Sequence, residues 1–251
     1  MVSCSSPVLT RLVKAMACTI GFSTRLSVMK YFLIILYTLF TFISANSGAA
    51  AVPGAAATPA TTIIMVFGDS LSAGYGLPQE AGWVSLLKKR LQTQSQAHLI
   101  NNSISGETAM GGRNRIEQAL KIHRPDIVIL ELGGNDGLRG ASIDSIRDSL
   151  ETIIEACHRN NATVLLAGMQ LPPNYGIAYT QKFQDIYAQL AKRHRLKLVP
   201  FLLDGFGDKR EFFQADGIHP NANAQQKIVE NVWKVLRTML KSQPTIADGR
   251  P

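Results

Sequence analysis

Short apolar runs alternate with longer amphipathic segments along most of this chain, and this alternation restricts its fold more than any other feature. Short apolar runs are typical of strands that are buried on both faces of a parallel sheet, while apolar residues at helical spacing indicate helices that cover it. We expect strands at residues 62–67, 98–103, 126–132, 163–168 and 197–201. We expect helices at about residues 79–95, 108–123, 142–160, 175–194 and 221–241. This order predicts an α/β fold with one parallel sheet and helices on both of its faces.

The first 51 residues have the composition of an export signal. They contain four basic residues and no acidic ones, and Lys30 precedes an apolar run at 31–43 and small residues at 44–51. A basic start, an apolar middle and a small-residue end form the layout of a secretory signal peptide. The run is short for a membrane-spanning helix, which needs about 20 residues. An uncleaved membrane anchor is the alternative.

These features divide the chain into a leader, a linker, a domain and a tail. Residues 1–51 are the leader, in which 29–51 form the signal peptide and 1–28 an upstream extension from a misplaced start codon. Cleavage is expected within Ala45–Ala57, which gives a periplasmic or secreted product. The Ala/Pro/Thr-rich linker, the folded domain and the flexible tail are expected at 52–61, 62–241 and 242–251, respectively.

Charge and cysteine content argue against a nucleic-acid surface and against a disulfide. The formal net charge is +8, but without the leader 22 basic residues face 18 acidic ones, a net of +4. The basic runs at 88–90 and 192–195 lie in expected helices and lack the interleaved aromatic residues of a base-stacking surface. Cys157 is the one cysteine outside the leader, so no intrachain disulfide is expected after processing. Its place in a helical apolar pattern predicts a buried structural thiol.

The tetrapeptide Gly68-Asp69-Ser70-Leu71 follows the first expected strand. A serine on a glycine turn beyond a buried strand can act as a nucleophile, and glycine tolerates backbone angles that larger residues do not. Gly-Asp-Ser is also ordinary turn chemistry. The other candidate residues follow later strands in the same way: Gly106, Asn135, Asp216 and His219. Because ligands bind beyond the carboxyl ends of parallel strands, we expect all five residues to converge on one edge of the sheet.

His219 is the best candidate for the base that a serine nucleophile requires. The other histidines open a strand or lie near helix ends among charged residues: His98, His123, His158 and His194. Asp216 precedes His219 by three residues, so its carboxylate can reach one ring nitrogen and leave the other for Ser70. A plain Asp216-Gly217 turn is the structural alternative. A histidine base predicts that activity is lost in acid.

Two glycine-rich segments can supply hydrogen-bond donors to a developing oxyanion. Asn135 follows Gly133-Gly134, and its amide can donate, as can the backbone N–H of Gly106. Glycine-rich turns without chemistry are the alternative. Gly133-Gly134 lacks the spacing of a dinucleotide fingerprint, and no His/Cys pattern indicates a metal. We therefore expect no cofactor and no metal.

The chain resembles the GDSL, or SGNH, hydrolases, a family marked by Ser, Gly, Asn and His in four blocks. The matching residues are Ser70 in Gly-Asp-Ser-Leu, Gly106 in Ser-Gly-Glu-Thr, Asn135 in Gly-Gly-Asn-Asp, and His219 in Asp-Gly-Ile-His-Pro. Residues 131–140 and 169–176, followed by Tyr179, Phe183 and Tyr187, are similar to the bacterial periplasmic thioesterase I/protease I/lysophospholipase and arylesterase subgroup. The resemblance covers roughly residues 62–240.

The resemblance implies a three-layer α/β/α sandwich with about five parallel strands. It implies Ser70 as nucleophile, His219 as base and Asp216 as the residue that orients the base. The implied oxyanion hole consists of the N–H groups of Ser70 and Gly106 and the side chain of Asn135. The loops at Gly137–Ala141 and Leu171–Pro173, including Leu138 and Pro172, would border the acyl chain.

The expected activity is hydrolysis of short to medium acyl esters, aryl esters and acyl thioesters, extending to lysophospholipids, through an acyl-enzyme on Ser70. The same residues would serve an acyltransferase that passes the acyl group to an alcohol or sugar. A non-catalytic acyl- or glycan-binding module is the alternative from another class, and we expect any amide hydrolysis to be slow. The expected partner is a small-molecule substrate, with no nucleic acid, no stable membrane span after processing, and a monomeric enzyme.

Overall fold

Five strands form one parallel sheet in the computed structural model, which describes residues 61–95 and 97–242. The strands are β1 (Thr62–Gly68), β2 (Ala97–Asn101), β3 (Ile127–Glu131), β4 (Thr163–Ala167) and β5 (Lys197–Val199). Their spatial order is β2-β1-β3-β4-β5, and every neighbouring pair is parallel. The second strand, β2, pairs with one edge of β1, and the third strand, β3, pairs with its other edge. The carboxyl ends of β1 and β3 therefore flank a topological switch point, where open α/β sheets bind ligands.

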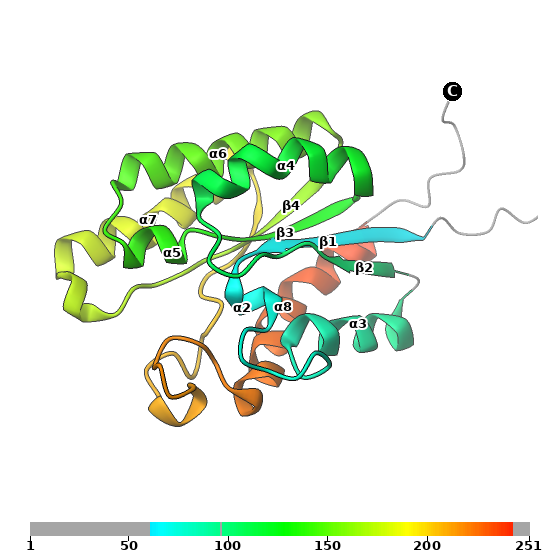
Figure 1. Ribbon diagram of the computed structural model, residues 1–251. Coiled ribbons are helices and arrows are strands. Elements are labelled where there is room, and N and C mark those ends of the chain that lie inside the picture. The colour runs from blue at the N-terminus through cyan, green and yellow to red at the C-terminus, as the bar shows by residue number, and fades with distance from the viewer. Residues whose placement is uncertain (1–60, 96, 243–251) are drawn as a thin grey trace, which may run out of the picture. The chain divides into compact units, whose positions relative to one another are not determined.

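Helices cover both faces of the sheet, as Figure 1 shows. One layer contains α3 (Trp83–Gln94) and α8 (Ala222–Ser242), and the other contains α4 (Ala109–His123), α6 (Ile143–Arg159) and α7 (Ile177–His194). Shorter helices are α2 (Ser70–Ala73), α5 (Gly134–Leu138), and the 3₁₀ turns η1 (Pro173–Tyr175) and η2 (Arg210–Phe212). The fold is the expected three-layer α/β/α sandwich.

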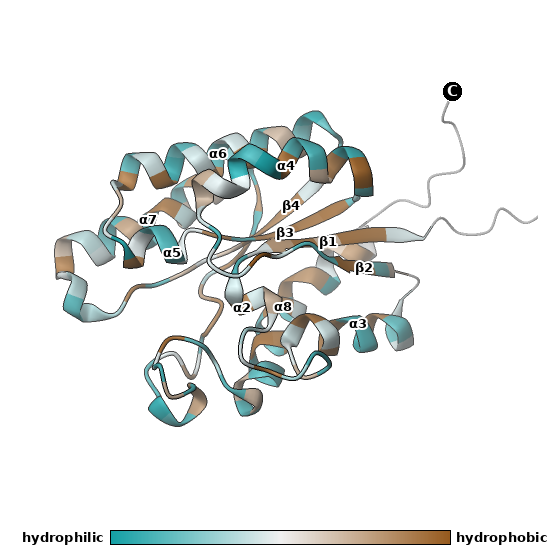
Figure 2. Ribbon diagram, viewed as in Figure 1, coloured by the Kyte–Doolittle hydropathy of each residue, from teal (hydrophilic) through white to brown (hydrophobic). Residues whose placement is uncertain are grey.

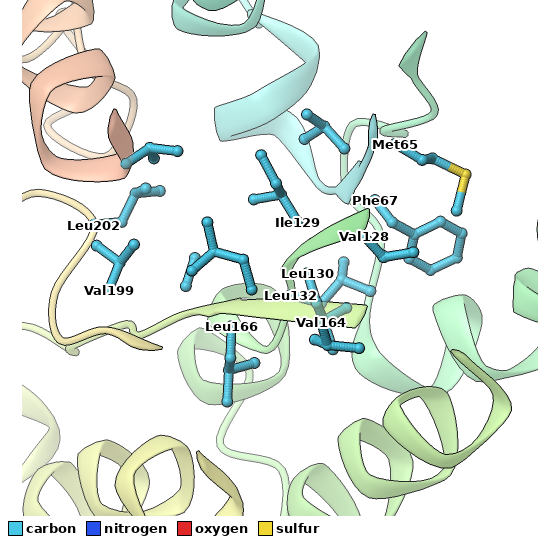
Figure 3. Packing of buried hydrophobic residues seen from close by; sticks show 14 of the residues in the cluster. Met65, Phe67, Val128, Ile129, Leu130, Leu132, Val164, Leu166, Val199 and Leu202 are labelled. Carbon is cyan, nitrogen blue, oxygen red and sulfur yellow. The ribbon is translucent and has the colours of Figure 1, made fainter. Parts of the chain in front are cut away.

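The central strands form the middle of the hydrophobic core. All five residues of β3 are buried, and β1 is buried from Ile64 to Gly68. These strands are the most uniformly apolar part of the ribbon in Figure 2. Figure 3 shows part of the core around them, with Phe67, Val128 and Val164 among its members. Strands that are buried on both faces position the loops at their carboxyl ends on a rigid base.

Side-chain caps fix where the helices beside the sheet begin. Thr108 accepts a hydrogen bond from the Gly111 N–H at the start of α4, and Ser142 accepts one from the Ser145 N–H at the start of α6. Asp69 does the same for α2 by accepting from the Leu71 N–H at 3.0 Å. Such caps satisfy N–H groups that lack a partner within the helix. The cap on α2 places Ser70 in its first turn.

The five strands and five long helices are confirmed, with ends that differ from the expected ones by a few residues. The helix expected from residue 79 begins at Trp83. The segments at Ser70–Ala73 and Gly134–Leu138, where we expected no helix, form short helices. Helices of four or five residues are too short to show a hydrophobic period. Cys157 is buried, as expected, and burial raises the pKa of its thiol to about 12.

The predicted leader, the linker except residue 61, and the tail except residue 242 lie outside the described residues. Within residues 61–95 and 97–242, no helix is both long enough and apolar enough to cross a membrane.

Candidate active site

Ser70 lies directly above the end of β1, in the first turn of α2. Gly68 before it does not have a positive φ angle, so our explanation from backbone freedom is wrong for this glycine. A glycine is needed at this position for a steric reason, because a Cβ atom at residue 68 would lie 2.6 Å from Oε2 of Glu131 and 2.8 Å from Oγ of Ser72. The glycine of this motif therefore makes room for a buried carboxyl group on the neighbouring strand.

His219 connects Ser70 to Asp216 through its two ring nitrogens. Its Nε2 lies 2.9 Å from the Ser70 Oγ, and its Nδ1 lies 2.7 Å from Oδ2 of Asp216. Tyr75 packs against the imidazole with its ring centroid 4.5 Å away. The arrangement lets a neutral imidazole accept the serine proton while the carboxylate holds the ring in place.

Asp216 is held as a carboxylate by the turn that it caps. Burial acts to raise its pKa, but hydrogen bonds from the Ile218 N–H and from the ring and N–H of His219 outweigh burial and lower the pKa to about 2. Hydrogen bonds to the charged form of an acid favour that form. The Asp216-Gly217 turn that we weighed as a plain structural feature is thus also the support for His219.

Asn135 lies beside Ser70 at the start of α5, and its amide group is fixed by two acceptors. Nδ2 donates to Oδ2 of Asp69 at 3.0 Å and to the carbonyl oxygen of Glu107 at 2.9 Å. The second bond ties Asn135 to the loop that carries Gly106. Within the described part of the chain, the backbone N–H groups of Ser70 and Gly106 have no hydrogen-bond acceptor. Asn135 is therefore bonded to Asp69, the neighbour of Ser70, and to Glu107, the neighbour of Gly106.

Asp69 contributes to this site in a way that the sequence reasoning missed. We considered it only as turn chemistry, but it caps α2 and holds Asn135 with the same carboxylate. Burial raises its pKa to about 6, although the hydrogen bond from Leu71 and the nearby His219 act in the opposite direction. Its position between Gly68 and Ser70 is the signal that could have identified it.

A cavity of about 670 Å³ opens over Ser70 and His219. Its lining includes Leu138, Leu171 and Pro172, which belong to the loops that the family resemblance implied, together with Met169. The lining also includes apolar residues that the sequence reasoning did not identify: Phe201, Leu203, Phe213 and Ile218. A largely apolar cavity with a few polar groups at one point is typical of a small-molecule site.

Three of the expected site residues do not line this cavity. Gly137 packs beneath it, where a Cβ atom would lie 2.7 Å from Phe183 and 2.8 Å from Leu171. Asp216 lies behind His219, and Gly106 lies on the loop beside Asn135. No group of His, Cys, Asp and Glu side chains within the described ranges could hold a metal ion.

Comparison with known proteins identifies the family. The profile of the GDSL-like Lipase/Acylhydrolase family matches residues 66–227. The chain is 43% identical to the Esterase TesA of Pseudomonas aeruginosa over 72% of its own length and 90% of the relative. It is 42% identical to an Arylesterase of Vibrio mimicus over 72% of its own length and 91% of the relative.

Another relative and two solved structures agree with this assignment. The Thioesterase 1/protease 1/lysophospholipase L1 of Escherichia coli is 40% identical over 72% of this chain and 86% of the relative. The crystal structure of TesA matches with a TM-score of 0.70 and 43% identity, over 71% of this chain and all of that one. The esterase EstA of Pseudoalteromonas sp. matches with a TM-score of 0.69 and 36% identity, over 72% of this chain and all of that one. This chain therefore belongs to the GDSL-like lipase/acylhydrolase family, and it is an ester hydrolase.

Proposed function

We propose that the protein hydrolyses short to medium acyl esters, aryl esters and acyl thioesters, including lysophospholipids, through an acyl-enzyme on Ser70. The observation that carries this proposal is the contact of Ser70 Oγ with His219 Nε2 at 2.9 Å, with Asp216 on the other ring nitrogen. Relatives named esterase, arylesterase and thioesterase/lysophospholipase support the range of substrates.

In the first half of the proposed reaction, the Ser70 oxygen attacks the carbonyl carbon while its proton passes to Nε2 of His219. The tetrahedral intermediate collapses when the imidazolium returns this proton to the leaving alcohol or thiol. In the second half, His219 takes a proton from water, whose oxygen attacks the acyl-serine. The imidazolium then returns this proton to Ser70 Oγ as the acyl–oxygen bond breaks and the acid is released. Asp216 stays ionised throughout, which agrees with its pKa of about 2.

The oxyanion of both intermediates would be bound by three donors. These are the N–H groups of Ser70 and Gly106 and the amide of Asn135, whose hydrogen toward the Glu107 carbonyl would be shared with the oxyanion. The N–H of Ser70 is available because the first residues of a helix have no partner within it. Loss of one such donor reduces the rate by about 10²–10³-fold in known enzymes.

The apolar lining of the cavity supports the proposal that it binds the acyl chain of the substrate. The apolar side chains that line the cavity with Ser70 include Leu138, Leu171, Pro172, Phe201 and Phe213. The volume of about 670 Å³ exceeds the needs of an acetyl group, so we propose that the enzyme also accepts longer chains.

The test measures initial rates on p-nitrophenyl esters of increasing chain length and on an acyl-CoA, for wild type and Ser70→Ala. We expect kcat/KM of Ser70→Ala to fall by about 10⁴-fold or more, because the nucleophile is lost. Ser145→Ala is the matched control, since Ser145 lies in the first turn of α6, away from the cavity. A fluorophosphonate should label wild type and Ser145→Ala but not Ser70→Ala. Inhibition of the relative EstA by monoethylphosphonate supports the choice of probe.

Two results would contradict the proposal. Equal background rates and no labelling in all three proteins would favour a binding module. Labelling of Ser70 with no hydrolysis, but with ester formation when an alcohol is added, would favour an acyltransferase.

We also propose that the protein is exported and that residues 62–241 are its catalytic domain. The order of Lys30, the apolar run at 31–43 and the small residues at 44–51 supports export. N-terminal sequencing of the protein from cells tests this, and a mature protein that retains residues 1–28 would contradict it.

A further inference from the structure

A buried polar cluster lies beneath Ser70, where β1 and β3 end side by side. We define the cluster as Asp69, Ser72 and Glu131, whose side chains are almost completely buried. The Asp69 N–H donates to Oε2 of Glu131 at 3.2 Å, and the Ser72 hydroxyl lies 2.6 Å from the same oxygen. None of the three takes part in the proton transfers of the proposed reaction, so their burial needs another explanation.

The cluster contains two carboxyl groups but no cation. Within the described ranges, neither Asp69 nor Glu131 forms an ion pair with a lysine or arginine. The titratable groups that face the pair are His219 from the loop before α8, Asp136 from α5 and Tyr187 from α7. Two adjacent buried carboxylates repel each other and lose their hydration, so the pair is expected to retain one proton.

The hydrogen bonds indicate which carboxyl group holds this proton. Asp69 accepts from the Leu71 N–H and from the Asn135 amide, both of which stabilise a carboxylate. The surroundings of Glu131 are less favourable for a negative charge, since its Oε1 is buried and has no hydrogen-bond partner in the described protein. Burial and the neighbouring Asp69 raise the pKa of Glu131 well above its usual range. Asp69 is therefore the charged member and Glu131 the neutral one.

We propose that Glu131 is a positioning residue for the oxyanion hole. Its buried, protonated carboxyl group fixes the Asp69 backbone and the Ser72 hydroxyl, so that the Asp69 carboxylate can orient the amide of Asn135. This inference deepens the proposed function and rests on it, because it assigns a support to a donor of that same site.

The geometry shows how this support reaches the reacting atoms. The Asn135 amide has two hydrogens, which are directed to Asp69 Oδ2 and to the Glu107 carbonyl, and these two acceptors set the plane of the amide. The bond to Asp69 holds the group, while the hydrogen on the Glu107 side would be shared with the oxyanion when substrate reacts. A shift of the Asp69 backbone moves one acceptor and also moves Ser70, the next residue. Misplacement by about 1 Å can reduce the rate of an enzyme by about 10²-fold.

The test compares Glu131→Ala and Glu131→Gln with wild type, using kcat per active site counted by fluorophosphonate labelling. Glu131→Ala removes the acceptor for the Asp69 N–H, and we expect kcat to fall by about 10²-fold with little change in KM. Glu131→Gln resembles a neutral acid in shape and in its carbonyl acceptor, and we expect it to recover most of the lost kcat. Glu155→Gln is the matched control, because Glu155 is exposed on α6 and remote from the cavity.

A second measurement detects the proton directly, without relying on activity. The infrared difference between wild type and Glu131→Gln at about pH 7 should contain the carbonyl band of a buried carboxylic acid. The difference between wild type and Glu155→Gln should not.

Three results would overturn the inference. They are the absence of this band, an unchanged kcat per labelled site in Glu131→Ala, and a glutamine variant as slow as the alanine variant. The last of these would mean that a charged Glu131 is required. If wild type itself had no esterase activity, the proposed function would fail, while the infrared band would still report on Glu131.

Discussion

Asp69 and Asp216 both interact with His219, but their surroundings move their pKa values in opposite directions. Burial raises the pKa of Asp69 to about 6, while hydrogen bonds from the 216–219 turn lower that of Asp216 to about 2. Pairs of acids that are separated in this way often have different roles in a site. Asp216 remains charged wherever a histidine base can work, whereas Asp69 approaches protonation just below neutral pH.

The raised pKa of Asp69 predicts a pH dependence of stability. Because the folded-state pKa of about 6 lies above the value of 3.8 for an unperturbed aspartate, the folded protein binds this proton more tightly than the unfolded chain does. The stabilisation is therefore complete below about pH 4 and is lost as the pH rises through about 6. We expect the free energy of unfolding of wild type, relative to Asp69→Asn, to decrease by about 2 kcal/mol between about pH 4 and pH 7.

Urea unfolding of both proteins across this pH range measures the difference and cancels the titration of groups that they share. Parallel stability curves for wild type and Asp69→Asn would show that Asp69 titrates alike in the folded and unfolded states. Asp216→Asn is the control with the opposite sign. The Asp216 carboxylate, which this variant lacks, stabilises wild type above about pH 4. That stabilisation is lost as the pH falls through about 2.

Among the secondary-structure elements, β4 and β5 approach each other closely at Gly168. A Cβ atom at residue 168 would lie 2.3 Å from the Pro200 carbonyl oxygen and 2.9 Å from that of Val199. Both contacts are with backbone, so a rotamer change cannot relieve them. We expect Gly168→Ala to lower the free energy of unfolding by about 3 kcal/mol or more, measured by urea unfolding.

Gly140→Ala separates this steric effect from the general cost of replacing glycine. Gly140 has a φ of 69° but no atom near its would-be Cβ, so only backbone strain of about 1–2 kcal/mol is expected. Equal losses in the two variants would show that the sheet opens at Gly168 without cost.

The sequence predicts the elements well where a regular pattern runs over several residues. Fully apolar strands such as β3 and amphipathic helices such as α6 and α8 have periods that identify them. The order of strands and helices also places Ser70, Asn135 and His219 at one edge. The short helices α2 and α5 were missed because their local sequence, Asp-Ser or Gly-Asn, is equally typical of turns.

The supporting contacts of the site could not be predicted in the same way. Glu131 lies beside Gly68 because of the register between β1 and β3, which no local pattern specifies. The hydrogen bond from Asn135 to Asp69 joins residues 66 positions apart and depends on the same register. Phe201 and Phe213, which line the cavity, belong to the long connection between β5 and α8, which contains the short turn η2. These features follow from packing between elements, and sequence patterns describe one element at a time.

The molecule as a whole brings the ends of its domain together at the site. Ser70 and His219 are separated by 149 positions, and the loop that carries His219 leads directly into α8. α8 packs against α3, and the Trp83 N–H donates to the Gln225 side chain at 2.9 Å. The catalytic geometry therefore depends on the last helix as well as on the sheet.

This dependence predicts which part of the chain is sufficient for folding and activity. The buried apolar residues of the described structure extend from Ile64 to Met239, so a fragment of residues 61–242 contains that entire core. We expect this fragment to unfold cooperatively, with the Tm of the full chain and the same kcat/KM on a p-nitrophenyl ester. A fragment of residues 61–221 lacks α8 and exposes the core positions that Ile228, Val232 and Leu236 cover, so it should not fold. A markedly lower Tm for residues 61–242 than for the full chain would mean that segments beyond these limits stabilise the domain.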